Sequence, residues 1–200
     1  MNSTDRKFAP AVLGPTTQRQ VAFVGPLGVG KTTAVRSISD VPVLSTEVMR
    51  AAIAVRADSF NNKRTTTVGI DYGEWTTPSG MRVGVVGTPG QVRFSSTRTS
   101  VIARRGSIVL WLFGDHPQPV QQAAEWIERL GDASVWSRLV LAITRRPPYG
   151  GTDLAEFEAC ARSYHPQMKV LDADPRVRED VARIIITALD NPYPTSGHAS

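Results

Sequence analysis

The stretch Gly25-Pro26-Leu27-Gly28-Val29-Gly30-Lys31-Thr32 decides the fold, because it matches the pattern G-x-x-x-x-G-K-[ST]. It follows a short apolar segment, residues 20–24 (QVAFV), that is typical of a strand, and it precedes a helical pattern over residues 31–39. Glycines let the backbone wrap closely around phosphate oxygens, and the N-terminus of a helix favours negative charge. The order strand, glycine-rich loop, helix therefore predicts a phosphate-binding site.

Two side chains of this stretch have predicted roles of their own. Lys31 places a positive charge at the outer phosphates of a nucleotide, and the Thr32 hydroxyl is a ligand of the kind that magnesium accepts. The other positions expected to contact the nucleotide, mainly through the backbone, are Gly25, Leu27, Gly28, Val29, Gly30 and Thr33.

The rest of the chain alternates apolar runs with helical patterns, which is typical of an α/β domain. A turn at residues 77–80 (TPSG) predicts an antiparallel hairpin, and residues 107–113 (SIVLWLF) predict a strand buried on both faces of a parallel sheet. We expect a mostly parallel mixed sheet with one antiparallel edge hairpin and helices on both faces. The expected strands are residues 20–24, 68–76, 81–86, 107–113, 139–144 and 168–171, and the expected helices are residues 31–39, 120–130, 153–162 and 176–189.

Length and composition favour one folded domain. The chain has 200 residues, 41% of them hydrophobic and 20% charged, which suffices for a single core. We expect a flexible segment at residues 1–18, one domain at residues 19–190 and a disordered tail at residues 191–200. No apolar run approaches the roughly 20 residues of a membrane span, and no signal peptide is evident, so we expect a cytoplasmic protein.

The chain is basic, with a net charge of +5 and a pI near 9.8. A basic surface attracts nucleic acid, but here the arginines are scattered along the chain and form no polybasic tract. We therefore expect no nucleic-acid partner, and we attribute the charge to a nucleotide ligand or an acidic protein partner.

Three stretches carry a resemblance to a known family, namely residues 25–32, residues 65–73 (TTTVGIDYG) and residues 87–91 (GTPGQ). With them the chain resembles the Ras-like small GTPases, especially the bacterial branch of gliding-motility GTPases and GTPases of actinobacterial conservon operons. The resemblance implies a P-loop NTPase fold of the Ras-like kind, a small GTPase-like domain over residues 19–190, and GTP or GDP bound with Mg²⁺. It also implies a regulatory partner of the roadblock/LC7 type and a downstream effector.

The resemblance assigns roles in two nucleotide-sensitive loops. Thr67 closes over magnesium and the γ-phosphate, the Gly90 N–H contacts the same phosphate, and Gln91 orients the attacking water. Arg64 is the candidate for an intrinsic catalytic arginine, with Arg93 as the second choice.

Two positions depart from the usual small-GTPase pattern. Gly87 stands where an aspartate commonly helps to hold magnesium, although glycine is also common in the resembling branch. Asp71 or Glu74 on the adjacent strand is a candidate replacement, and a simple solvated carboxylate is the alternative. Leu27 stands where many relatives have glycine, which implies slow hydrolysis or a differently supplied arginine.

The base-recognition motif is altered as well. Residues 144–147 (TRRP) stand where the family has N/T-K-x-D, so Thr144 fits the first position and the Arg145 stem is expected to lie over the purine. Pro147 replaces the aspartate that accepts hydrogen bonds from guanine. Because a site built to satisfy these donors is what rejects adenine, guanine and adenine both remain open.

A fifth motif follows at residues 171–174 (LDAD). The resemblance implies that Asp172 and Ala173 line the base site and that the Ala173 N–H meets guanine O6. Asp174 either replaces the carboxylate lost at Pro147 or simply caps the following helix.

Three functions are compatible with this sequence. The favoured hypothesis is a magnesium-dependent guanine-nucleotide switch with slow GTP hydrolysis that controls a partner protein and can reach a membrane peripherally through partners. The alternatives are a hydrolysis-deficient pseudo-GTPase scaffold and a P-loop ATPase with relaxed base specificity.

Overall fold

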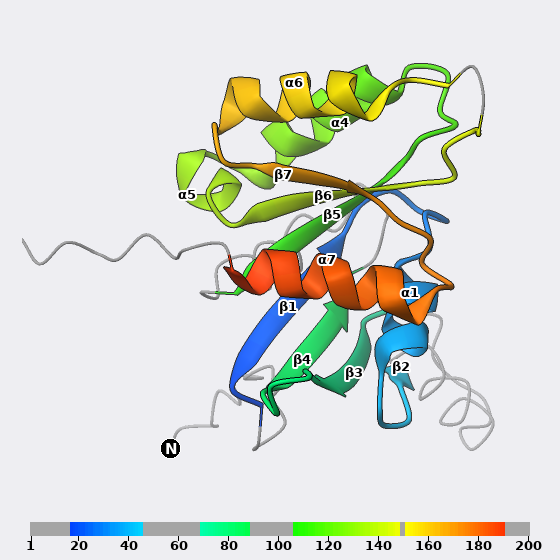
Figure 1. Cartoon of the computed structure of the whole chain (residues 1–200), viewed down its shortest axis with the longest axis vertical. Coiled ribbons are helices and arrows are strands. Elements are labelled where there is room, and N and C mark those ends of the chain that lie inside the picture. Colours follow the sequence, from blue (N-terminus) through cyan, green and yellow to red (C-terminus); the bar gives the residue numbers. More distant parts are fainter. Residues whose placement is uncertain (1–16, 46–68, 89–105, 149–150, 191–200) are drawn as a thin grey trace, which may run out of the picture.

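The computed structural model describes residues 17–45, 69–88, 106–148 and 151–190, which form one α/β domain (Figure 1). Most of the predicted segments 1–18 and 191–200 therefore lie outside the described residues. The elements in chain order are β1 (Arg19–Val24), α1 (Lys31–Ile38), β2 (Leu44–Ser45), β3 (Asp71–Thr76), β4 (Arg82–Gly87), β5 (Ser107–Phe113), α4 (Pro119–Leu130), α5 (Ala133–Trp136), β6 (Leu139–Thr144), α6 (Leu154–Tyr164), β7 (Lys169–Asp172) and α7 (Arg178–Asp190).

The strands form a seven-stranded sheet in the order β2-β3-β4-β1-β5-β6-β7. β3 runs antiparallel to both β4 and β2, whereas the neighbours from β4 to β7 are parallel. The predicted mixed sheet and its hairpin are thus confirmed. The hairpin turn is closed by hydrogen bonds between Thr77 and Met81 and between Gly80 and Thr77, and Gly80 has a φ of +83°.

Two short elements differ from the prediction. β2 has two residues and adds an outer strand beside β3, so the hairpin is not the edge of the sheet. α5 is a four-residue helix whose N-cap, Asp132, accepts a hydrogen bond from the Ser134 N–H. The remaining elements begin and end within three residues of the predicted bounds.

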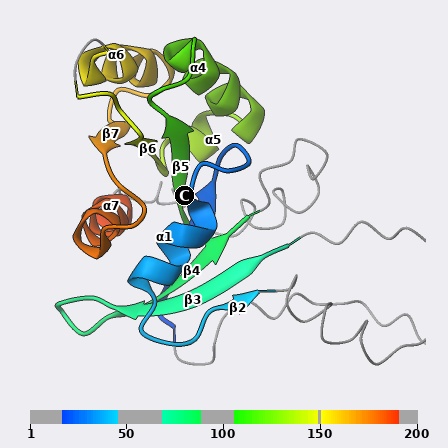
Figure 2. The ribbon, with the colours of Figure 1, turned by 90° about the vertical axis from the view of Figure 1, so that its right-hand side faces the viewer.

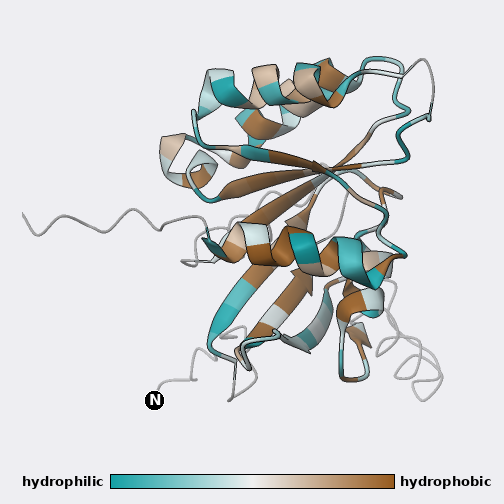
Figure 3. Ribbon diagram, in the orientation of Figure 1, coloured by the Kyte–Doolittle hydropathy of each residue, from teal (hydrophilic) through white to brown (hydrophobic). Residues whose placement is uncertain are grey.

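Helices cover the two faces of the sheet in pairs, with α1 and α7 on one face and α4 and α6 on the other (Figures 1 and 2). Alternation along β5 serves both faces, because Trp111 packs with the α1 and α7 side while Leu110 and Leu112 pack with the α4 and α6 side. This two-sided burial explains why β5 and β6 are almost wholly hydrophobic in Figure 3.

The strand order changes direction next to β1, which lies between β4 and β5. In open α/β sheets ligands bind outside the carboxyl ends of the strands at such a point. The glycine-rich loop at residues 25–30 follows β1 directly and precedes α1. The topology therefore places the predicted phosphate loop where a ligand is expected.

Gly25 makes the tightest backbone approach in this region. Its φ is +135°, and a Cβ atom on it would lie 2.1 Å from the carbonyl oxygen of Trp111 in β5. A carbonyl of a central strand cannot move aside as a flexible side chain can. Only glycine therefore lets the chain turn from β1 into the phosphate loop.

The Gly25→Ala variant is expected to be less stable by roughly 1–3 kcal/mol of overpacking in addition to backbone strain. Gly80→Ala is the matched control, because Gly80 also has positive φ, at +83°, but has open space where the Cβ would stand. Urea unfolding of both variants measures the difference. Equal losses of stability in the two variants would contradict the conclusion that the Trp111 carbonyl oxygen is what requires glycine at position 25.

Candidate functional site

The loop at residues 25–30 adopts a conformation that glycine favours. Gly25, Gly28 and Gly30 have φ values of +135°, +78° and +107°. Gly30 is the N-cap of α1, and among the described residues no side chain caps that helix and no acidic residue stands in its first turn. The positive end of α1 is therefore left for an external anion.

Lys31 is buried, with 7% of its surface exposed. Its ammonium donates to the carbonyl oxygens of Gly25 at 2.9 Å and Pro26 at 2.7 Å. Burial lowers the pKa of Lys31 to about 8, and the negative charge of Asp71 partly opposes this shift. In this structure the positive charge of Lys31 has little contact with water, and the carbonyl oxygens of the phosphate loop are its hydrogen-bond acceptors.

Thr32 contacts a carboxylate on another element. Its hydroxyl donates to Oδ2 of Asp71, the first residue of β3, at 2.5 Å. Asp71 pairs in register with Gly87 at the end of β4. A Cβ built on Gly87 would lie 3.6 Å from the same Asp71 oxygen. The Asp71 carboxylate thus lies next to the place that a side chain at position 87 would occupy.

Glu74, the other candidate for this replacement, is committed elsewhere. It forms an ion pair with Arg82 and accepts a hydrogen bond from the Tyr72 hydroxyl at 2.9 Å. The structure therefore distinguishes the two acidic residues of β3, and it is Asp71 that faces the predicted magnesium ligand Thr32.

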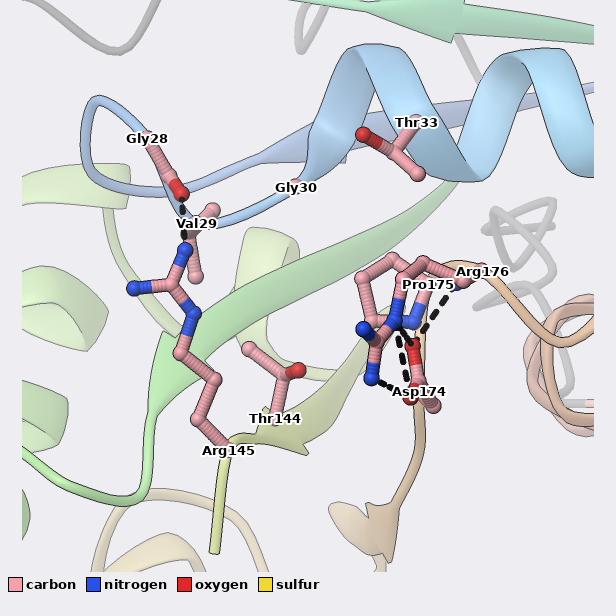
Figure 4. A pocket seen from close by; sticks show the side chains of 9 residues that line it. All are labelled: Gly28, Val29, Gly30, Thr33, Thr144, Arg145, Asp174, Pro175 and Arg176. Atoms are coloured by element: carbon pink, nitrogen blue, oxygen red, sulfur yellow. Dashed lines mark hydrogen bonds and ion pairs between the residues drawn. The ribbon is translucent and has the colours of Figure 1, made fainter.

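A pocket of about 320 Å³ opens beside the phosphate loop (Figure 4). The loop and α1 form one wall, and the other is formed by the last residue of β6, the residue after it and the segment after β7. Its lining residues are Gly28, Val29, Gly30, Thr33, Thr144, Arg145, Asp174, Pro175 and Arg176. Thr33, Thr144 and Arg145, all predicted to contact the nucleotide, thus meet at one pocket.

Arg145 ties the base-site loop to the phosphate loop. It has a φ of +56°, which is uncommon for a residue with a side chain. Its Nη2 donates to the Gly28 carbonyl oxygen at 3.0 Å, and its guanidinium lies 5.0 Å from the centre of the Phe113 ring. The guanidinium is therefore bound to the protein itself in this structure.

Two predicted base-site residues are placed differently from the expectation. Asp172 accepts from Arg146 at 3.1 Å and does not line the pocket. The N–H of Ala173, which was expected to meet guanine O6, already donates to the Ile143 carbonyl oxygen at 2.9 Å, because the pairing of β7 with β6 continues through it. Asp174, the next residue, lines the pocket instead.

Sequence reasoning missed Pro175 and Arg176 as lining residues. Arg176 binds Asp174 through its side chain, with Nη2 at 2.6 Å from Oδ2. Pro175 packs where a Cβ on Gly30 would stand, with its Cγ 2.6 Å from that position. The sequence Asp-Pro-Arg at residues 174–176 was the one available signal for these lining residues, and by itself it indicates only a capped turn.

Several predicted residues cannot be placed. Arg64, Thr67, Gly90, Gln91 and Arg93 lie outside the described residues, so their roles stay predictions. Among the placed residues, Leu27 is 68% exposed on the phosphate loop. Pro147 is exposed as well and does not line the pocket.

Comparison with known proteins establishes the fold. No family profile and no curated protein sequence matches the chain. Among solved structures, the chain is similar to the G domain of the FeoB iron transporter of T. maritima, with a TM-score of 0.55 at 15% identity, covering 86% of this chain and 98% of that one. The chain therefore shares the fold of that G domain, with a mostly parallel sheet, an antiparallel side and helices on both faces.

Membrane-spanning character is absent from the helices within residues 17–45, 69–88, 106–148 and 151–190. None of the helices placed there combines the length and the apolar character that crossing a bilayer requires.

The low pKa of Lys31 predicts how phosphate binding depends on pH. Because a bound anion favours the ammonium form, binding raises the pKa from about 8, so the affinity is constant below pH 8 and falls as the pH rises above it. Between pH 7 and pH 9 the loss is about tenfold. Titration of nucleotide binding across this range measures it.

Lys31→Arg is the control for this experiment, because a guanidinium stays charged throughout the range. Its affinity is expected to be independent of pH between 7 and 9. Parallel curves for the wild type and Lys31→Arg would show that another group causes the loss.

Proposed function

We propose that this protein is a magnesium-dependent guanine-nucleotide switch that hydrolyses GTP slowly. The observation that carries the proposal is the contact between Thr32 and Asp71 beside the buried Lys31, at the start of an uncapped helix. A hydroxyl, a carboxylate and an ammonium at the mouth of a glycine-rich loop are the groups that a nucleoside triphosphate with a divalent cation requires.

The loop binds the phosphates in this proposal. Lys31 exchanges the Gly25 and Pro26 carbonyl oxygens for phosphate oxygens, which are stronger acceptors because they are charged. The first N–H groups of α1 face the same anion. The pocket beside the loop receives the nucleoside.

The donor set at Thr32 and Asp71 fits magnesium. Magnesium prefers oxygen ligands, keeps several waters and is bound through one or two carboxylates together with phosphate oxygens. Magnesium at this site would neutralise charge on the outer phosphates. Thr67 supplies a second hydroxyl by the family resemblance.

Hydrolysis depends on the second loop in this proposal. Gln91 orients the attacking water, the Gly90 N–H contacts the γ-phosphate, and Arg64 stabilises the transition state, all three by resemblance. The exposed Leu27 side chain on the phosphate loop restricts the approach of a partner's arginine and makes turnover slow.

The resemblance also supplies the biological setting. A regulatory protein of the roadblock/LC7 type activates the switch, and an effector recognises the loops that carry Thr67 and Gln91 when GTP orders them. The protein acts in the bacterial cytoplasm, reaches membranes only through partners and binds no nucleic acid.

Two observations favour alternative functions. The Lys31 ammonium is satisfied by its own loop without a ligand, which suits a scaffold that folds without nucleotide. Residue 147 is a proline, so the carboxylate that usually rejects adenine is missing at that position, which suits an ATPase.

Binding and turnover measurements test the proposal against both alternatives. Titrations with labelled GTP, GDP and ATP are expected to show tight magnesium-dependent binding of GTP and GDP and weak binding of ATP. Single-turnover assays are expected to show slow phosphate release from GTP that Gln91→Ala reduces by about 100-fold or more. Equal affinity for ATP would favour the ATPase, and GTP binding without phosphate release, even with a roadblock protein added, would favour the scaffold.

The magnesium site has a sharper test. Asp71→Asn is expected to raise the magnesium concentration needed for GTP binding by about tenfold or more, because a charged ligand is lost. Glu74→Gln is the matched control, since Glu74 stands on the same strand but pairs with Arg82. It should leave the magnesium dependence unchanged.

A double variant can restore the site. Adding Gly87→Asp to Asp71→Asn places a carboxylate on the paired residue, whose Cβ would stand 3.6 Å from the present Asp71 oxygen. Recovery of most of the lost magnesium affinity is expected. If Asp71→Asn behaves like Glu74→Gln, the carboxylate of Asp71 does not serve magnesium.

A further inference from the structure

The pocket wall includes the Asp174 carboxylate, for which the sequence leaves two roles open, base recognition and helix capping. One wall carries Gly28, Gly30 and Thr33 from the phosphate loop and α1, and the opposite wall carries Asp174 and Arg176 from the segment between β7 and α7 (Figure 4). A ligand held by the phosphate loop in this pocket therefore has Asp174 within the same cavity.

The Asp174 carboxylate is ionised and bound to one arginine. Arg176 donates through Nε to both carboxylate oxygens, at 2.9 and 3.1 Å, and through Nη2 to Oδ2 at 2.6 Å. These hydrogen bonds hold the pKa of Asp174 below its usual range. The site thus offers a negatively charged acceptor at neutral pH.

The arginine that holds this carboxylate is easily displaced. The Arg176 side chain is 78% exposed, whereas that of Asp174 is 33% exposed. Exposed ion pairs contribute little, because both partners are well solvated when they separate. Ligand donors can therefore replace the Arg176 side chain while the carboxylate stays in the pocket wall.

The chemistry of the purine edges selects one base for such an acceptor. Guanine presents the adjacent donors N1–H and N2–H, which pair with the two oxygens of a carboxylate. Adenine presents one donor group, at N6, next to the N1 lone pair, which a carboxylate repels. Xanthine has a carbonyl oxygen at C2 where guanine has an amino group. A carboxylate therefore favours guanine over both.

We infer that Asp174 is the residue that selects guanine, an inference that rests on the proposed function. Position 147, where the resembling family has the base-selecting aspartate, is a proline outside the pocket, and the Ala173 N–H is bound to the Ile143 carbonyl oxygen. Asp174 is the one carboxylate among the lining residues described. Guanine binds by exchanging the Arg176 side chain for its own donors.

A purely structural role for Asp174 is the alternative. Its carboxylate accepts from the Arg176 backbone N–H at 2.9 Å, and its own N–H donates to Asp180 at 2.9 Å, so it shapes the turn before α7. Asparagine serves as well as aspartate in such a cap, because its side-chain carbonyl accepts the same hydrogen bond. The Asp174→Asn variant therefore keeps the turn and changes only the donors and acceptors that a base meets.

The experiment compares GTP, XTP and ATP binding to the wild type and to Asp174→Asn. The wild type is expected to prefer GTP, and the variant to lose about tenfold or more in GTP affinity and to gain about tenfold or more for XTP, because an amide N–H pairs with the xanthine C2 carbonyl. Asp132→Asn is the matched control, since Asp132 also caps a helix by accepting a hydrogen bond from a backbone N–H, that of Ser134, and lies outside the pocket. It should keep the wild-type order.

Arg176→Ala separates the carboxylate from its partner. The preference for GTP over ATP is expected to survive within about threefold, because the acceptor remains. If Asp174→Asn keeps the wild-type preferences, or if the preference is lost in Arg176→Ala instead, Asp174 is not the selector. If the wild type binds none of the three nucleotides, the proposed function itself fails. If the wild type binds GTP and only the Asp174→Asn result disagrees, the failure is confined to this inference.

Discussion

The register between β3 and β4 is the constraint on which the site depends. It pairs Asp71 with Gly87 and so directs the Asp71 carboxylate to the Thr32 hydroxyl at the start of α1. A slip of one residue would turn Asp71 to the other face of the sheet. The turn at residues 77–80 fixes this register, because its hydrogen bonds close the hairpin between the two strands.

The proposed site has two carboxylates, but at positions that differ from the usual small-GTPase pattern. The resembling small GTPases commonly carry carboxylates at the positions of Gly87 and Pro147, and this chain has none there. Asp71 begins β3, the neighbour of the strand that ends at Gly87, and lies beside Thr32. Asp174 follows β7, the neighbour of the strand before Pro147, and lies in the wall of the pocket. If both serve as proposed, each lost carboxylate has been replaced from an adjacent strand end, where the backbone already approaches the ligand.

Much of this fold was predictable from the sequence, and the reasons are local. The run at residues 139–144 gave the bounds of β6 because both of its faces are buried, and the glycine pattern placed α1 because phosphate loops require it. β2 was not predictable, since two residues with an exposed Leu44 carry no periodicity. α5 was missed for the same reason of length.

In the site, the motif was enough to predict that Lys31 and Thr32 lie at the phosphate loop. It could not predict the hydrogen-bond partners of Asp71 and Ala173. Side-chain direction at Asp71 depends on a strand register that composition does not specify. The Ala173 N–H was assigned to a ligand, whereas the sheet extends one hydrogen bond further than the sequence pattern indicates and binds it to Ile143. Short-range sequence patterns thus predicted most of the helices and strands. The partners of the site residues depend instead on pairing between segments that are distant in the sequence.

A crystal structure with a non-hydrolysable GTP analogue and Mn²⁺ in place of Mg²⁺ tests the central claim most directly. Anomalous scattering locates the ion independently of the refined coordinates. The account predicts a peak at about 2.1–2.2 Å from the Thr32 hydroxyl, with the Asp71 carboxylate in direct or water-mediated contact. A metal bound without Thr32, or an Asp71 side chain turned away from it, would contradict the account.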